Sequence, residues 1–160
     1  MTSKPFTTCL WFDTQGEEAA HYYMGIFKDS RLGRVQRYTS AGPGAEGTVA
    51  TVEFELNGQK FSALNGGPQH KFNEAVSIVV PCADQAEVDY YWDSLLASGG
   101  QENVCGWLSD QYGLRWQIVP TAFFGMIADA DSERAARVTQ AMFGMTKLDI
   151  AGLERAYAGA

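Results

Sequence analysis

The chain has 160 residues, of which 46% are hydrophobic and 19% charged, so it has the composition of an ordinary globular protein with enough length for one well-filled core. Its formal net charge of −7, with Lys and Arg scattered along the sequence, argues against nucleic acid as a partner, because a phosphate backbone binds basic patches. No stretch approaches the roughly 20 apolar residues that a membrane-spanning helix needs, and residues 1–6 precede no apolar core typical of a signal peptide.

The pattern of cysteines indicates a reducing compartment. Cys9, Cys82 and Cys105 are odd in number, far apart and without a C-x-x-C pair, which is typical of neither a disulfide framework nor a zinc site. We therefore expect a cytoplasmic protein without a membrane partner.

The first half of the chain predicts one helix among four strands. Apolar residues at helical spacing predict a helix over 17–27, and Thr14 followed by Glu17 suggests a capping box at its start. Asn57-Gly58 predicts a tight hairpin between the last two strands. The strands of this half are expected over residues 6–12, 31–38, 48–56 and 59–64.

The same pattern then starts again. Residues 75–80 form a near-continuous apolar strand, suited to burial on both faces. Asp84 is a plausible N-cap for a helix over 85–97, which Ser98-Gly99-Gly100 ends. Further strands are expected over 102–104, 107–109 and 115–120.

The two halves align as an internal repeat. A shift of 69 residues places Leu10 on Val79 and superimposes the two helical stripes, and a shift of 55 places Phe61 on Trp116. Such a repeat indicates two βαβββ units that bury their faces against one another. A chance likeness between two ordinary strand–helix units is the alternative.

The predicted fold class is therefore α+β, in one domain spanning residues 1–160. The first module covers about 5–66 and the second about 72–121, and residues 122–160 form a helical tail. Helices are expected in this last part of the chain at 121–126, 132–143 and 149–158, with Ser132 and Asp149 as caps. The tail either covers a cavity mouth, reaches a partner subunit or packs on its own domain.

Three segments carry a resemblance to a known family: TVEFELNGQKFSALNGGP, FNEAVSIVVPCADQAEVDYYWDSLL and CGWLSDQYGLRWQIVP. On these the chain resembles the vicinal-oxygen-chelate superfamily, which includes glyoxalase I, extradiol dioxygenases and fosfomycin-resistance proteins. Within it the chain is similar to the PhnB-like group, which carries the designation 3-demethylubiquinone-9 3-methyltransferase. The resemblance implies a homodimer in which paired βαβββ modules curve a mixed sheet around a cavity.

Strand alternation separates the side chains that face such a cavity from those that face a helix. In the strand at 75–80 the more apolar set suits the helix, which leaves Ala75, Ser77 and Val79 facing inward. In the strand at 115–120 the same argument leaves Arg115, Gln117 and Val119 inward. The repeat then assigns partners in the first half. The candidate ligand-binding residues are Thr8, Leu10, Ser62, Leu64, Ser77, Trp107 and Gln117, with His70 at the rim.

Related enzymes hold a divalent metal in this cavity, and the resemblance implies ligands from the first, fourth, fifth and eighth strands. The matching residues are Thr8, Ser62 or Leu64, Ala75 or Ser77, and Gln117. Divalent cations prefer several carboxylate or imidazole donors, so one amide and a few hydroxyls do not make such a site. We expect no metal and no cofactor.

Other candidate residues leave alternatives open. His70 either contacts a substrate or is a solvated loop residue, whereas His21 is expected at the surface or at a helix–sheet seam. Cys105 is either a nucleophile or an ordinary core thiol. Glu53 and Glu55 alternate on one strand face as an acid/base pair or, more simply, as a solvent-facing edge. Among the tryptophans, the ones expected in the core are Trp11, Trp92 and Trp116.

Three functions remain open at this level: a metal-free protein that binds a small organic molecule, a lyase, isomerase or dioxygenase with a degenerate metal site, and a structural dimer with a collapsed cavity. Methyl transfer is not supported. S-adenosylmethionine enzymes of the common type need a Gly-rich turn between a parallel strand and a helix, where the helix amides face the ligand. The glycine pairs of this chain do not lie in such a turn.

Overall fold

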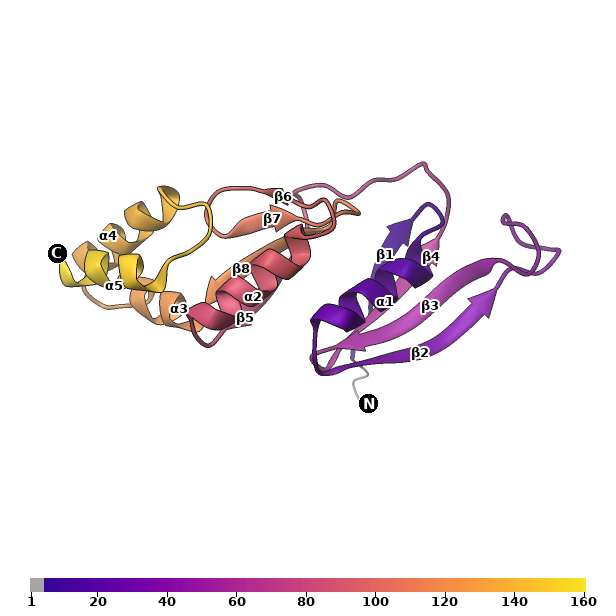
Figure 1. Ribbon diagram of the computed structural model, residues 1–160, viewed down its shortest axis with the longest axis horizontal. Helices are drawn as coiled ribbons and strands as arrows, with labels where there is room; N and C mark the ends of the chain where they lie inside the picture. Colours follow the sequence, from indigo (N-terminus) through magenta and orange to yellow (C-terminus); the bar gives the residue numbers. More distant parts are fainter. Residues whose placement is uncertain (1–4) are drawn as a thin grey trace. The chain divides into compact units, whose positions relative to one another are not determined.

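The computed structural model describes residues 5–160, which divide into two compact units between Lys71 and Phe72. We refer to residues 5–71 as the first module and to Phe72–Ala160 as the second. Each module contains its own four-stranded mixed sheet, which confirms the predicted α+β class with two tandem βαβββ units (Figure 1). Among the described residues, no helix has both the length and the apolar content that crossing a membrane requires.

The first module is built from β1 (Thr8–Phe12), α1 (Gly16–Ile26), β2 (Ser30–Arg37), β3 (Val49–Leu56) and β4 (Gln59–Asn65). The strand order is β1-β4-β3-β2, with β1 parallel to β4 and the other pairs antiparallel. Helix α1 covers one face of this sheet (Figure 1).

Aromatic packing holds α1 on the sheet. Tyr23 of α1 stacks on Phe54 at 6.3 Å between ring centroids, and Phe54 stacks on Phe61 at 5.3 Å. All three rings are buried, and such stacks add to the hydrophobic gain of burial. The predicted hairpin is confirmed, because Asn57 and Gly58 adopt φ values of 47° and 79°, which a tight primed turn requires.

The predicted capping box is wrong. Helix α1 begins at Gly16, its N-cap is Gln15, and no side chain of the cap bonds to the first turn. Instead, Asn65 at the end of β4 accepts a hydrogen bond from the Gly16 N–H at 2.7 Å. A tertiary contact satisfies the helix start, and a local sequence motif cannot reveal it.

The second module repeats the arrangement with β5 (Ser77–Cys82), α2 (Gln85–Leu96), β6 (Gln101–Glu102), β7 (Trp107–Ser109) and β8 (Arg115–Pro120). The strand order is β5-β8-β7-β6, with β5 parallel to β8.

Asp84 caps α2 as predicted, since its carboxylate accepts from the Glu87 N–H at 2.9 Å. Strand β5 begins two residues later than predicted, where pairing with Arg115 of β8 begins, and Val76 before it is 65% exposed.

The tail forms three helices, α3 (Thr121–Ile127), α4 (Ser132–Phe143) and α5 (Ile150–Ala158). Asp149 caps α5 as predicted, but Asp131 rather than Ser132 caps α4, because its carboxylate reaches two N–H groups of the first turn. The helices share one apolar cluster with the end of β8, so the tail packs on its own module. The buried members of this cluster are Val119, Phe123, Val138, Leu148 and Leu153.

A loop between α4 and α5 straps the tail to the rest of the second module. The N–H groups of Cys105 and Gly106 donate to the carbonyls of Met145 and Thr146 at 2.7 and 2.8 Å. The Gln85 side chain donates to the Leu148 carbonyl and accepts from the Ile150 N–H. Lys147 pairs with Asp89 of α2 at 2.7 Å.

The internal repeat is confirmed, but its register in the first strand is wrong by one residue. Phe61 pairs with Thr8 and the equivalent Trp116 pairs with Ile78, so the shift between β1 and β5 is 70 rather than 69. The connection before α1 is one residue longer than the connection before α2, which restores the shift of 69 in the helices. Leu10 therefore corresponds to Val80 and not to Val79.

Candidate functional site

Each sheet has one face that its helix covers, and the candidate site lies on the other. We call this second face the distal face. It points away from α1 in the first module and away from α2 in the second. In the first module Ala63 faces the helix, since a Cβ added to Gly16 of α1 would lie 3.1 Å from the Ala63 Cβ. Ser62 and Leu64 alternate with Ala63 and so lie on the distal face, as predicted.

Thr8 and Leu10 lie on the wrong face for the predicted cavity. They pair with Phe61 and Ala63, which face α1, and Leu10 is only 5% exposed. The error follows from the register, because a slip of one residue moves every side chain of a strand to the opposite face. Thr8 instead contacts the Gln59 amide at 3.3 Å near the strand end.

The distal face of the first module is charged. Arg31 pairs with Glu55 at 2.7 Å and Arg34 with Glu53 at 3.5 Å, and Lys60 and Ser62 complete a shallow pocket of about 420 Å³. The two glutamates are each paired with an arginine across the strands. They are a solvent-facing ladder rather than an acid/base pair facing a substrate.

His70 lies beside Trp11, not in the charged pocket. The Trp11 and His70 rings meet edge to face at 4.8 Å, and the indole N–H donates to the Gly67 carbonyl at 2.9 Å. Gly66 packs so closely that a Cβ there would lie 2.2 Å from the indole. Trp11 was expected in the core, but it is half-buried beside the 66–70 loop. It pairs with Leu64 and so lies on the distal face, which again reflects the one-residue error in the register of β1.

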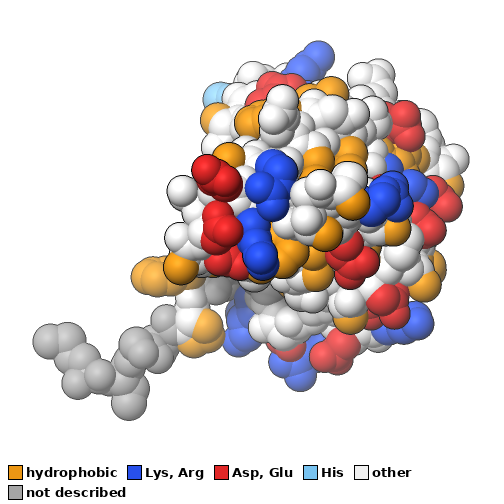
Figure 2. Space-filling model, turned by 90° about the vertical axis from the view of Figure 1, so that its left-hand side faces the viewer, with side chains coloured by type: hydrophobic (Ala, Val, Ile, Leu, Met, Phe, Trp, Pro, Cys, Tyr) orange, Lys and Arg blue, Asp and Glu red, His pale blue; other side chains and the backbone are white. Residues whose placement is uncertain are grey.

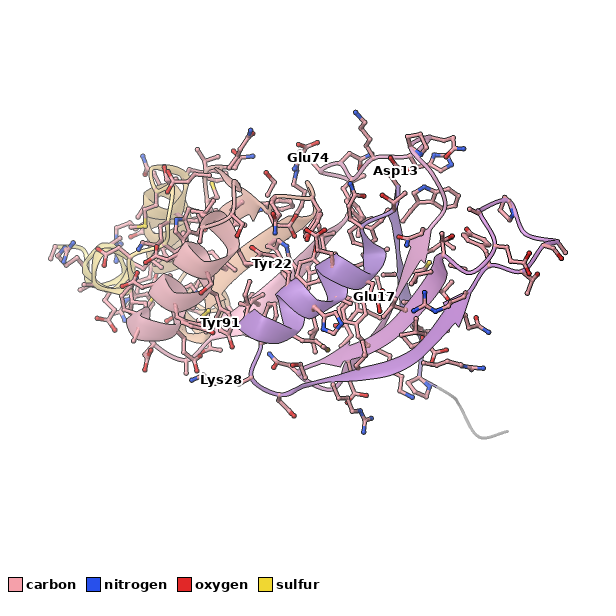
Figure 3. All side chains as sticks on the ribbon, turned by 45° about the vertical axis from the view of Figure 1, so that its right-hand side comes forward. Asp13, Glu17, Tyr22, Lys28, Glu74 and Tyr91 are labelled. Carbon is pink, nitrogen blue, oxygen red and sulfur yellow. The ribbon has the colours of Figure 1, made fainter. Side chains whose placement is uncertain are left out.

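A further pocket of about 540 Å³ in the first module had no signal in the sequence analysis. Asp13 and Glu17, both labelled in Figure 3, line it beside the 39–48 loop. Tyr38 donates its hydroxyl to the Asn65 carbonyl at 2.5 Å, and Gly44 packs on the Tyr38 ring. Gly42 and Gly44 of this loop thus serve local packing around one tyrosine.

The distal face of the second module holds the predicted polar anchor. Gln117 on β8 donates its amide nitrogen to the Ser77 hydroxyl of β5 at 2.8 Å, and both side chains are half-buried. Gln117 and Trp107 line one pocket of about 470 Å³, a size typical of small-molecule sites. The structure thus brings Ser77, Gln117 and Trp107 together on one face, and their contact with a ligand stays a prediction.

Apart from Glu74 and Asn103 the rest of this pocket is mainly apolar, and five of its lining residues come from the tail. Val79 and Val104 line one part, and the tail contributes Phe124, Met142 and Phe143. These tail residues could not be predicted from the sequence, because nothing in their own pattern distinguishes a pocket wall from a helix-packing stripe.

One ion pair borders this pocket. Glu74, labelled in Figure 3, accepts two hydrogen bonds from the Arg115 guanidinium at 2.5 and 3.0 Å. These hydrogen bonds hold the pKa of the Glu74 carboxyl below its usual range, so it is ionised at neutral pH. The pair satisfies both charges beside the pocket.

The three cysteines are free thiols in different surroundings. Cys105 lines the apolar pocket with a left-handed backbone, at φ 61°, while Cys9 is exposed. Cys82 is fully buried, and burial together with the nearby Glu87 and Asp84 raises the pKa of its thiol to about 12. Cys82 is therefore an inert core residue.

The donor atoms do not suit the divalent metal that the superfamily implies. Ser62, Leu64, Ser77 and Gln117 offer no carboxylate or imidazole, and the Gln117 nitrogen is bonded to Ser77. Across residues 5–160, no three His, Cys, Asp or Glu side chains come together as a metal site. Charged side chains are instead interspersed in sign on the face drawn in Figure 2.

The comparisons with known proteins agree with this description. The profile of the 3-demethylubiquinone-9 3-methyltransferase family matches residues 4–119. The PhnB protein of Bacillus cereus, which carries the same designation, is 34% identical and superimposes with a TM-score of 0.64 over 74% of this chain and 100% of its own. This chain belongs to the 3-demethylubiquinone-9 3-methyltransferase family. No curated protein matches the sequence.

More distant structures share the fold. PA1353 of Pseudomonas aeruginosa is 16% identical with a TM-score of 0.61, over 74% of this chain and 98% of its own. The fosfomycin resistance protein FosX of Listeria monocytogenes is 14% identical with a TM-score of 0.52, over 75% and 94%. At these identities the likeness is one of fold alone. The tail lies beyond the residues that the family profile matches.

Proposed function

We propose that this PhnB-like protein binds a small organic molecule, without a metal ion, in the distal pocket of the second module. The observation that carries the proposal is Gln117, which is bonded to Ser77 and lines a mainly apolar pocket of about 470 Å³. Small-molecule sites combine apolar walls with a few convergent polar groups in this way. Ser62 and Leu64, on the distal face of the first module, stay predictions as ligand contacts.

The chemistry of the site favours binding over the metal-dependent reactions of the superfamily. A lyase or dioxygenase mechanism of that kind needs a Lewis acid held by carboxylate or imidazole donors. Residues at the matched positions supply hydroxyls and one amide. Binding, transport or sequestration needs only the shape and the polar anchor that the pocket has.

A thermal-shift screen against neutral aromatics and amphiphilic acids tests the proposal, because a ligand that binds only the native state raises the melting temperature. Each ligand found is then measured on Gln117→Leu. We expect binding to weaken about tenfold, since one hydrogen bond is lost, while the protein stays folded.

Gln101→Leu is the matched control, because Gln101 is an exposed residue of β6 that lies outside the pocket lining. If no compound in the screen raises the melting temperature, or if both leucine variants bind a ligand as the natural chain does, the proposal fails.

We also propose that the protein is a homodimer, as the resemblance to the superfamily implies. Each sheet has two edge strands, and pairing between subunits is one way to protect such edges. Sedimentation at micromolar concentration should give twice the mass of one chain, and a monomer would contradict this.

A further inference from the structure

Large apolar side chains around the distal pocket of the second module are exposed to solvent. Val79 is 46% exposed, Val104 56%, Phe124 44% and Phe143 67%, and all four line this one pocket. Exposed apolar surface that gathers around one concavity, instead of being scattered, marks a binding site. The walls suit an apolar and flat molecule.

The two phenylalanines come from the tail, outside the part of the chain that the family profile matches. Phe124 is held by its neighbour Phe123, whose ring lies 6.1 Å away and is buried in the tail cluster. Phe143 ends α4 just before the strap whose carbonyls bond to Cys105 and Gly106. Packing in the tail cluster therefore positions the ring of Phe124, and the strap after α4 positions the ring of Phe143.

Gln117 specifies the polar group of the ligand. Its amide nitrogen donates to Ser77, and the amide oxygen then remains to accept a hydrogen bond within the pocket. A ligand that offers an O–H or N–H donor satisfies this oxygen, whereas a pure hydrocarbon leaves it unpaired.

The charges argue against an anion. Among the described residues, Glu74 is the one charged residue that lines the pocket, and the Arg115 guanidinium is bonded to it. No cation in the lining is left for a carboxylate, and the chain as a whole has a net charge of −7.

Resting on the proposed function, we propose that the ligand is a neutral aromatic molecule with one hydrogen-bond donor, such as a phenol or an indole. In this proposal Phe124 and Phe143 select its aromatic body and the Gln117 oxygen selects its donor. The tail is then the part of the chain that determines specificity.

The test uses three probes with the same bicyclic body: 2-naphthol, naphthalene and 2-naphthoate, measured by equilibrium dialysis against the full chain at pH 7. We expect 2-naphthol to bind about tenfold more tightly than either of the others. The preference over naphthalene should disappear in Gln117→Leu, because the acceptor is gone.

The double variant Phe124→Ala with Phe143→Ala should bind 2-naphthol about tenfold more weakly, since two aromatic contacts are lost. Both rings are exposed, so the variant is expected to fold, and circular dichroism checks this. Phe6→Ala is the matched control, because Phe6 is 97% exposed and lies in the first module.

The outcomes separate the two proposals. If other compounds bind in a Gln117-dependent manner but 2-naphthoate binds as tightly as 2-naphthol, this inference is overturned and the proposed function stands. The same holds if the double variant keeps full affinity for 2-naphthol. If the double variant instead turns a dimer into a monomer at unchanged affinity, the exposed rings belong to an interface between copies, and the inference is wrong.

Discussion

The two modules share one backbone plan and carry opposite chemistry on their distal faces. In the first module arginines and glutamates pair across β2 and β3, and in the second an amide and a hydroxyl lie among valines and aromatic rings. Their helix faces are alike, since Phe61 and Trp116 occupy equivalent buried positions. The repeat therefore conserves the core, and the alternate positions of the same strands are free to differ in function.

The tail adds a second difference. Helices α3, α4 and α5 pack against Val119 on the distal side of β8. Side chains of α3 and α4 line the pocket there. The first module has no comparable helical addition among the described residues. The module with the candidate site is therefore the one whose sheet is supplemented by the helices of the tail.

The largest expected difference is in thiol reactivity, and it tests the corrected register. Cys9 lies at the position equivalent to the exposed Val79, and Cys82 at the position equivalent to the buried Phe12. A pKa of about 12 leaves roughly one Cys82 thiol in ten thousand ionised at pH 8. Iodoacetamide labelling followed by peptide mass spectrometry should modify Cys9 on the order of a thousandfold faster than Cys82.

Labelling in urea, where the chain is unfolded, is the control and should bring the two rates close together. Equal rates in the native protein would mean that β1 presents Cys9 to the helix, as the shift of 69 requires.

The next effect compares the two cores. Phe61→Ala and Trp116→Ala should each lower the free energy of unfolding by about 3–5 kcal/mol, because each removes a buried aromatic side chain. We expect the larger loss at Trp116, since its indole N–H donates at 2.8 Å to the buried Asp110 carboxylate and the substitution removes that donor. Urea unfolding gives both values. A larger loss at Phe61 would show that the modules differ in core packing as well as on their distal faces.

A smaller effect concerns the strap of the tail. Gln85→Leu removes the side chain that bonds to the backbone of Leu148 and Ile150, and we expect about 1–3 kcal/mol of lost stability. Hydrogen exchange should report faster exchange of the Ile150 amide. Gln101→Leu makes the same substitution at an exposed site and should change neither quantity.

The smallest effect is the ion pair between Lys147 and Asp89. The hydrogen bond between them lowers the pKa of Asp89 and raises the pKa of Lys147. The stabilisation is therefore present above the ordinary pKa of an aspartate, near 4, and is lost as the pH falls through the lower native value. At the other end it is lost as the pH rises through the raised pKa of the lysine.

A double-mutant cycle with Asp89→Asn and Lys147→Met at pH 7 should give a coupling of about 0.2–1 kcal/mol, as is typical of partly exposed pairs. The coupling should vanish near pH 2. A coupling that survives there would mean that the two side chains interact through packing instead of charge.

Most of the fold could be predicted from the sequence, because its signals are local and periodic. The helical stripes, the Asn57-Gly58 turn and the alternation in β8 each depend on neighbouring residues, and Asp84 caps its own helix. The strand at 6–12 shows where this fails. Its alternation alone does not say which set is buried, and a one-residue difference in the loop before α1 reversed the assignment of Thr8 and Leu10.

The candidate site could be predicted only in its sheet. Gln117 and Ser77 follow from strand parity, and their hydrogen bond agrees with it. Phe124 and Phe143 line the pocket because tertiary contacts hold the tail in place, such as those of Gln85 and Cys105 with the strap. No short sequence motif indicates such contacts.

Nuclear magnetic resonance of the labelled full chain, titrated with 2-naphthol, tests most directly that the ligand site lies on the distal face of the second module. The account predicts shifts of the Gln117 side-chain amide, the Trp107 indole N–H and the Val79 methyl groups. Residues of the charged pocket, such as Arg31 and Glu53, should not shift. Shifts confined to the first module, with the Gln117 and Trp107 signals unmoved, would contradict the account.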